Sequence, residues 1–408
     1  MHDGPHTERP AHPLDALAHT LAEITVGWLD PHSRISPPLW DRVAPLYEEV
    51  YASVLGTHGA VSRRRLPESA LPRPGDDAAF RALAAAVRAS LERDEEFAER
   101  SRLRLIRIEE FARLVPHHGA AYGDQPEPMS LDRQIEVLAG AAVPPPRAEG
   151  PVGLSFVLAY RAGPSDPHRV RNLLACLAAL GRQDVPRSGY RVIAVEQDVR
   201  PRLRELVEPL VDDYVFAPNP GAYNYAWGRN IGVRAAPGRG PVCLLDIDMV
   251  VPEDFVRKCR DTMGGEVGAV LPYDEVLYLD ERSSSAVVGG LAASRSVLPA
   301  GALRGSFLRE VRGGAVVVDR AVYERIGGQD ERFRGWGDED NEFYRQLRAV
   351  TEMRRLPGVM HHLDHPRPVM RRDGGRVNAP SMAVPRSLGE PFGDVHRFQD
   401  EVSPAPGA

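Results

Sequence analysis

The feature that most constrains the fold is an alternation of short apolar runs with helical spacing in the second part of the chain. An apolar run at 154–159 is followed by apolar residues at helical spacing over 170–180, and strand-like runs recur at 190–195 and 242–245. This alternation predicts an α/β fold with a mixed, mainly parallel sheet flanked by helices. Ligands of such sheets bind beyond the carboxyl ends of the strands, which is where we look for a site.

The N-terminal part of the chain has a different pattern. Apolar residues recur at helical spacing over 14–24, 40–50 and 80–91, so we expect an all-helical region there. Prolines 144 to 146 lie in a stiff connector, and the end of the chain combines proline and glycine with little periodicity. The predicted parts are a helical N-terminal accessory region (1–143), an α/β domain (151–385) and a loosely ordered tail (386–408).

Composition excludes several classes of protein. Of the 408 residues, 43% are hydrophobic and 26% charged, which is typical of a packed globular protein and not of a disordered chain. The net charge of -6 gives no reason to expect nucleic-acid binding, because phosphate backbones are bound by concentrated positive charge.

Cysteine usage and the N-terminus indicate the compartment. The three cysteines form no CxxC pair, so neither a zinc site nor a disulfide framework is expected. Residues 1–13 contain no apolar stretch long enough for a signal peptide or an anchor, and we expect no transmembrane segment. We therefore predict a cytoplasmic protein. Lys258 is the only lysine, a bias typical of GC-rich coding sequences that favours a bacterial source.

Two carboxylates directly follow the apolar run at 242–245. Asp246 and Asp248 flank Ile247, and alternation along an extended chain points both acids to one side. Such oxygen ligands suit Mn²⁺ or Mg²⁺, which can neutralise a diphosphate. Asp-x-Asp triplets also occur in solvated turns, so this motif alone leaves both interpretations open.

A glycine-rich, acidic segment follows later in the chain. It begins with Gly313-Gly314 and ends with Gly335-Trp336-Gly337-Asp338-Glu339-Asp340. Acids are favoured at a helix N-terminus, so one interpretation is an ordinary first turn capped by Asp338. That interpretation does not explain Gly-Trp-Gly. Glycines let the backbone bend around a bound group and Trp336 offers a platform for a sugar ring, so we favour a functional segment.

Three histidines lie close together near the end of the predicted domain. His361, His362 and His365 follow a strand-like segment and precede Pro366. A single histidine is more often an ordinary core or surface residue. Three within five positions favour a metal site completed by His362 or His365.

These motifs, in this order, resemble those of family 2 and β-1,4-galactosyltransferase-type glycosyltransferases over residues 151–366. Residues 223–232 resemble the helix that precedes the Asp-x-Asp strand in that family. The resemblance implies a GT-A fold and a glycosyltransferase of the hexosyltransferase type. It also implies a nucleotide-sugar donor, UDP-sugar first, a hydroxyl-bearing acceptor, and Mn²⁺ or Mg²⁺ as cofactor.

The resemblance further implies roles for individual residues. Asp246 and Asp248 would hold the metal and the donor phosphates, with Asp248 the preferred direct ligand and His362 and His365 completing the site. Donor-side positions are Ala159, Tyr160, Arg161, Glu196, Asp198, Arg229, Asp246 and Ile247. Acceptor-side positions are Gly314, Trp336 and Glu339. Asp340 matches the catalytic base of inverting members; for Arg229, solvation of its helix is an equally good interpretation.

Several alternatives stay open. Retaining relatives carry asparagine where this chain has Asp340, which favours inversion, but Asp338 and Asn341 depart from the galactosyltransferase pattern and leave the acceptor undecided. A sugar nucleotidylyltransferase would need a glycine-rich, basic loop after the first strand, and 159–164 is a poor match. A non-catalytic relative that only binds sugar or nucleotide would keep the same residues. The donor sugar, the pathway, the oligomeric state and the role of the helical region are not decided by the sequence.

Overall fold

The structure is a computed structural model. It describes residues 13–56, 71, 73, 75–142, 152–162, 165–335, 337–366, 371–372, 375–376, 378, 386 and 391–401. By its contacts the chain divides into two compact units. The first comprises Met1–Pro128, Leu277–Ala286 and Leu298–Arg309, and the second comprises Met129–Val276, Val287–Val297 and Glu310–Ala408. The predicted domain boundary falls at residues 143–151, which lie outside the described part, and stays a prediction.

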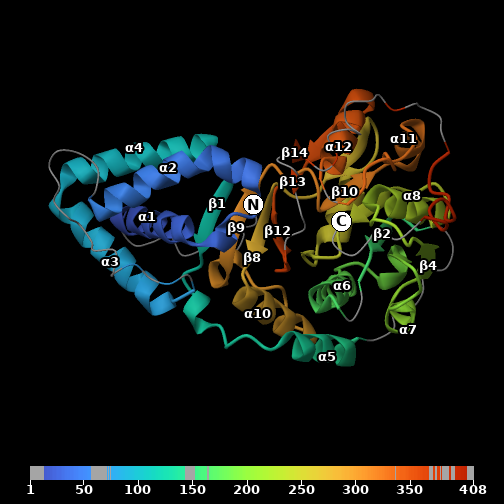
Figure 1. The fold of residues 1–408 in the computed structure, drawn as a ribbon, viewed down its shortest axis with the longest axis horizontal. Coiled ribbons are helices and arrows are strands. Elements are labelled where there is room, and N and C mark those ends of the chain that lie inside the picture. Colours follow the sequence, from blue (N-terminus) through green and yellow to red (C-terminus); the bar gives the residue numbers. More distant parts are fainter. Residues whose placement is uncertain are drawn as a thin grey trace. The chain divides into compact units, whose positions relative to one another are not determined.

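Four helices build most of the first unit and lie side by side in Figure 1, coloured blue to cyan. They are α1 (Pro13–Leu29), α2 (Pro37–Leu55), α3 (Asp77–Arg93) and α4 (Glu95–Phe111). Asp76 and Asp94 begin α3 and α4 by accepting backbone N–H groups at 2.9 and 2.8 Å. The apolar stripes expected from the sequence form one core, with Leu21, Tyr47 and Phe80 buried in it.

The predicted all-helical region also contains one strand. β1 (Leu114–His118) pairs antiparallel with β9 (Arg304–Arg309), so that Leu114 lies opposite Leu308. Local periodicity does not reveal this strand, because its hydrogen-bonding partner lies far along the chain.

The second unit is built on a seven-stranded sheet in the order β11-β7-β10-β5-β2-β3-β4. Its strands are β2 (Ser155–Tyr160), β3 (Arg191–Asp198), β4 (Asp213–Pro218), β5 (Val242–Leu245), β7 (Val267–Leu271), β10 (Ala315–Val318) and β11 (Glu352–Arg355). β10 runs antiparallel to both neighbours, and the other pairs are parallel. The predicted mixed, mainly parallel α/β sheet is confirmed.

Helices connect and cover these strands (Figure 1). α6 (Pro167–Leu180) joins β2 to β3, α7 (Arg204–Val207) lies between β3 and β4, and α8 (Tyr225–Ala235) joins β4 to β5. The other helices are α5 (Leu131–Ala141), α9 (Phe255–Thr262), α10 (Glu281–Ala292), α11 (Arg320–Arg325) and α12 (Glu339–Val350). β3 and β4 lie on one side of β2 in the sheet, whereas β5 lies on its other side. The strand order therefore reverses between β2 and β5. Ligands of open α/β sheets bind at such a reversal.

Several short strands complete the second unit. β12 (Val359–His362) pairs antiparallel with β6 (Met249–Val250), which places His362 opposite Met249. β13 (Arg371–Arg372) and β14 (Gly375–Arg376) pair antiparallel, and β8 (Glu275–Leu279) has residues in both units. Among the described residues, no helix combines the length and the apolar character needed to cross a membrane.

Part of the predicted loose tail is packed against the second unit. Phe398 is only 6% exposed and its ring lies 4.9 Å from that of Trp227, whose indole N–H donates to the carbonyl of Asp394 at 2.7 Å. These contacts attach residues 391–401 to the second unit. The predicted loose order of the tail, residues 386–408, stays a prediction.

Candidate active site

The site begins where β5 ends. The four residues of β5 are fully buried, and the chain then turns at Asp246. The Asp246 N–H donates to the carbonyl of Gly314 at 2.8 Å, because β10 pairs with β5 with Ala315 opposite Leu245. Asp246 and Asp248 thus lie beside the strand-order reversal, as predicted from the alternation of strands and helices.

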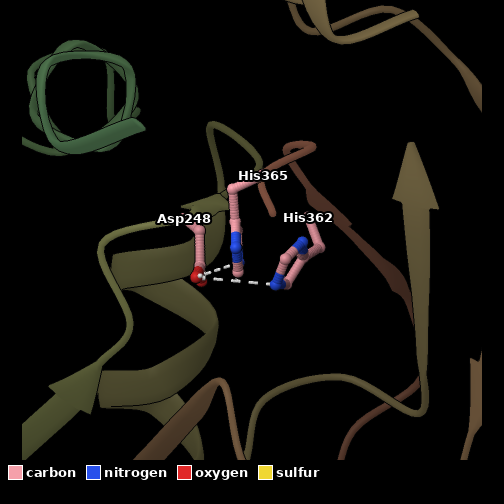
Figure 2. Close-up of side chains that lie close together, drawn as sticks. All are labelled: Asp248, His362 and His365. Carbon is pink, nitrogen blue, oxygen red and sulfur yellow. Dashed lines mark ion pairs between the residues drawn. The ribbon is translucent and has the colours of Figure 1, made fainter. Parts of the chain in front are cut away.

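Asp248, His362 and His365 form the only group of three or more potential metal-binding side chains among the described residues. Their ligand atoms lie within 4.8 Å of one another. Nε2 of His365 is 3.2 Å and Nε2 of His362 is 3.5 Å from Oδ2 of Asp248, and Figure 2 shows the three side chains converging. The pairing of β12 with β6, together with an N–H···O bond of 2.9 Å from Leu363 to the carbonyl of Asp248, brings these segments together.

This cluster fits a divalent cation. Oδ1 of Asp248 is buried and has no hydrogen-bond partner in the described part of the chain, so a ligand oxygen remains available. One carboxylate and two imidazoles suit Mn²⁺ and related ions. Burial alone would raise the pKa of Asp248, but His362, His365 and the charge of Arg169 lower it below the usual range. His361 is buried on the same strand and is not part of the cluster.

A buried arginine supports the loop between His362 and His365. Arg171 on α6 is fully buried and donates to the carbonyl and to Oδ1 of Asp364 at 2.5 and 2.8 Å. The same guanidinium donates to Oε1 of Gln134 at 2.7 Å. It therefore fixes the residue that immediately precedes His365. No sequence pattern indicates this role, because Arg171 lies on a helix 193 positions away from Asp364.

Arg229 connects two of the predicted functional carboxylates. Its Nη2 lies 2.6 Å from Oδ1 of Asp246 and its Nη1 lies 3.2 Å from Oδ1 of Asp340. The guanidinium is 1% exposed, stacks 3.8 Å above the ring of Tyr225 and donates to the Tyr225 hydroxyl. Solvation of the helix, one interpretation of Arg229, is therefore wrong. Burial and the charges of Asp248 and Asp340 raise the pKa of Asp246, so a cation at this point is stabilising.

The Gly-Gly segment makes room for Asp340. A Cβ at Gly313 would overlap with Oδ2 of Asp340, so a larger residue there would displace the Asp340 carboxylate. Gly314 has a φ of 90°, which L side chains rarely adopt, and the buried Tyr273 hydroxyl donates to the carbonyl of Gly313. Burial and the adjacent charge of Asp340 raise the pKa of Glu339 to about 8.

The turn before α12 is held in left-handed backbone conformations. Gly335, Gly337 and Asp338 have φ angles of 68°, 111° and 71°. The helix begins at Glu339, as expected, but the Asp338 side chain makes no capping hydrogen bond. Trp336 lies outside the described residues, and its predicted contact with a sugar stays a prediction.

The predicted donor-side residues at the end of β2 are buried or held by hydrogen bonds. Ala159 and Tyr160 are buried, and Tyr223 donates its hydroxyl to the carbonyl of Ala159 at 2.9 Å. Arg161 donates to the carbonyls of Gln197, Gly221 and Asn219 at 2.8 to 2.9 Å. Its guanidinium thus holds the loop after β4 beside the strand end.

The two acids predicted after the second strand are also engaged within the protein. Glu196 is fully buried and accepts the N–H of Arg202 at 2.7 Å and the hydroxyl of Tyr214 at 2.5 Å. Asp198 accepts the N–H of Val199 at 2.6 Å and pairs with Arg202 at 2.8 Å. These contacts order the turn after β3.

One cation near the carboxylates was missed by sequence analysis. Arg169 lies in the first turn of α6; its charge contributes to the lowered pKa of Asp248 and opposes the rise in the pKa of Asp246. The only sequence signal was a basic residue shortly after the first strand, at the end where ligands bind.

Comparisons with known proteins support the resemblance found in the sequence. A family model described as the N-terminal domain of galactosyltransferase matches residues 305–367, which include Gly313, Gly314, Asp340, His362 and His365. No curated protein matches this chain.

Solved structures show more distant similarity. The catalytic domain of Drosophila β1,4-galactosyltransferase 7 in complex with xylobiose is 16% identical, with a TM-score of 0.30, over 50% of this chain and 65% of that chain. A mutant of that enzyme in complex with manganese, UDP-Gal and xylobiose gives a TM-score of 0.31 at the same identity and coverage. S. aureus TarS 1–349 is 12% identical, with a TM-score of 0.37, over 52% of this chain and 60% of that one. The chain thus spans less than two thirds of each, and its resemblance to galactosyltransferase-type glycosyltransferases is confirmed by the family model over residues 305–367.

Proposed function

We propose that this protein is a metal-dependent, inverting glycosyltransferase of the GT-A type. It would transfer a sugar from a nucleotide-diphosphate donor, a UDP-sugar first, to a hydroxyl group of a saccharide or small-molecule acceptor. The observation that carries the proposal is the arrangement of carboxylates around Arg229. Asp246 is two positions from Asp248 of the histidine cluster and shares the guanidinium of Arg229 with Asp340.

The donor side of the reaction needs positive charge near the departing diphosphate. Asp248, His362 and His365 are the residues that would hold Mn²⁺ or Mg²⁺. The bound ion would neutralise the charge that develops on the leaving nucleotide. Arg169, whose charge favours the ionised form of both aspartates, would add a second positive charge on the same side. Pairing with Arg229 keeps the Asp246 carboxylate from facing the phosphates without a counter-charge.

The acceptor side needs a base that is held in one orientation. Asp340 lies in the first turn of α12, with Oδ1 on Arg229 and Oδ2 against the backbone of Gly313. In the proposed reaction the acceptor oxygen forms a bond to the anomeric carbon as the bond from that carbon to the diphosphate oxygen breaks. Asp340 takes the acceptor proton, and the leaving nucleotide diphosphate keeps the bonding electron pair. A single displacement from the opposite face inverts the anomeric carbon.

A thermal-shift screen tests this function. UDP, GDP, CDP and dTDP are each added with and without Mn²⁺, because a ligand that binds the folded state raises the apparent Tm. We expect one nucleotide to raise the Tm only when Mn²⁺ is present, and the matching sugar nucleotides are then assayed for transfer. Stabilisation without any Mn²⁺ dependence would instead favour a non-catalytic nucleotide-binding protein. No response to any nucleotide would contradict the proposal.

A further inference from the structure

The C-terminal segment, residues 391–401, contacts the backbone that leads into the proposed catalytic base. The Glu401 carboxylate pairs with both terminal nitrogens of Arg334, at 2.6 and 3.0 Å. The same guanidinium lies 3.9 Å from the ring centroid of Phe398. Arg334 directly precedes the turn at 335–338, so the C-terminal segment holds the entrance to that turn.

Asn378 holds both ends of the same turn. Its Oδ1 accepts the backbone N–H of Arg334 at 2.9 Å, and its Nδ2 donates to the carbonyl of Gly337 at 2.8 Å. The side chain is 4% exposed, so these bonds are protected from exchange with water. One side-chain amide therefore bridges residues 334 and 337.

The two glycines of this turn have open space around them in the described part of the chain. A side chain at Gly335 or Gly337 would meet no atom within 4 Å in the described structure, so crowding does not determine these glycines. The two glycines adopt their positive φ angles readily, whereas the left-handed conformation of Asp338 needs outside support. Besides Asn378, that support comes from the N–H of Gly335, which donates to the carbonyl of Tyr223 at 2.8 Å.

The C-terminal segment has its own attachment to the second unit. Phe398 packs on Trp227, the N–H of Gly393 donates to Oε1 of Glu331 at 2.6 Å, and Arg397 pairs with Glu331 at 2.5 Å. Trp227 lies on α8, the helix that also carries Arg229. The segment is thus attached to α8 and to the chain that leads into the turn.

We infer that Asn378 and Glu401 are positioning residues that hold residues 334–338 in the conformation that places Asp340 for catalysis. The inference rests on the proposed function, because positioning matters only if Asp340 is the base. Neither residue belongs to the site recognised from the sequence, and neither contacts the predicted metal or donor residues. Their effect on catalysis passes through the backbone of the turn.

Hydrogen–deuterium exchange tests whether Asn378 and Glu401 hold the turn, and it needs no substrate. Asn378→Asp keeps the acceptor for Arg334 but loses the donor to Gly337, and Glu401→Gln removes the ion pair. We expect amides within 333–343 to exchange about fivefold faster in each variant, with the rest of the protein unchanged. Glu352→Gln, which breaks the exposed pair with Arg354, is the matched control and should leave 333–343 unchanged. Unaltered exchange at 333–343 in both variants, or acceleration spread over the whole protein, would overturn the inference.

The effect of the two variants on catalysis is measured by steady-state kinetics, with the donor that the thermal-shift screen identifies. We expect both variants to lose about tenfold in kcat while the Mn²⁺-dependent affinity for the nucleotide stays unchanged. Glu401→Asp, which keeps the charge, should recover part of the loss. Faster exchange combined with unchanged kcat would refute positioning. If wild type shows no transfer, the proposed function fails, whereas the exchange experiment still decides whether these residues hold the turn.

Discussion

Arg229 on α8 and Asp340 on α12 form an ion pair of 3.2 Å across 111 positions of sequence. The same guanidinium also pairs with Asp246 at 2.6 Å, so one buried cation serves the proposed base and the first acid of the Asp-x-Asp motif. Breaking this arrangement should have consequences for both stability and catalysis.

Replacing Arg229 by glutamine should destabilise the protein by ~2 kcal/mol. Removing one member of a fully buried ion pair destabilises a protein by more than this. The cost is smaller here because the side chains of Asp246 and Asp340 are 26% and 28% exposed, so they regain part of their hydration when Arg229 is lost. Urea unfolding of wild type and variant measures the difference. Arg354→Gln, which breaks an exposed pair, is the control and should change stability by less than about 0.5 kcal/mol. Equal stabilities of wild type and Arg229→Gln would contradict the structural role of this cation.

Asp248→Asn should abolish the Mn²⁺-dependent rise in Tm with nucleotide. The substitution removes the one carboxylate in the ligand cluster and leaves its volume nearly unchanged. Isothermal titration with Mn²⁺ measures the loss directly, and we expect the affinity to fall at least about 100-fold. Asp254→Asn, whose carboxylate pairs with Lys258 at 2.9 Å on the surface, is the control and should bind normally. A variant with wild-type Mn²⁺ affinity would place the ion elsewhere.

Asp340→Asn should lower kcat about 100-fold to 10,000-fold, because an amide cannot take the acceptor proton. Binding of nucleotide with Mn²⁺ should be nearly unchanged, since Asp340 is not in the ligand cluster. Steady-state kinetics and the thermal shift together separate the two effects. Transfer at the wild-type rate would remove Asp340 from the mechanism.

Acid should destabilise the helical unit through Glu23. Burial alone would raise its pKa, but hydrogen bonds and charge from His117 and His19 lower the pKa to about 2 from an ordinary 4.5. A carboxyl group with a lowered pKa stabilises the fold above its unfolded pKa, and the contribution is lost as the pH falls from about 4.5 to about 2. The pKa difference corresponds to about 3 kcal/mol. Urea unfolding at pH 6 and pH 3 should show a smaller pH dependence for Glu23→Gln than for wild type; equal dependences would contradict this assignment.

Patterns over a few residues of the sequence were enough to predict several strands and helices of this protein. The strands at 155–160 and 242–245, the covering helix at 167–180 and the start of α12 follow from apolar spacing and from an acidic first turn, which act over a few residues. The order of the Asp-x-Asp, Gly-Gly, acidic and histidine segments likewise indicated which residues to examine.

Only the tertiary structure decided how those residues meet. The pairing of β12 with β6 selected His362 and His365, rather than His361, as partners of Asp248. The fold also brings the buried guanidinium of Arg229 within ion-pair distance of both Asp246 and Asp340. The contact of Phe398 with Trp227 attached the C-terminal segment to the helix that carries Arg229. Each of these depends on side chains that are distant in sequence and are brought together by strand pairing and core packing, and periodicity along the chain carries no information about such contacts.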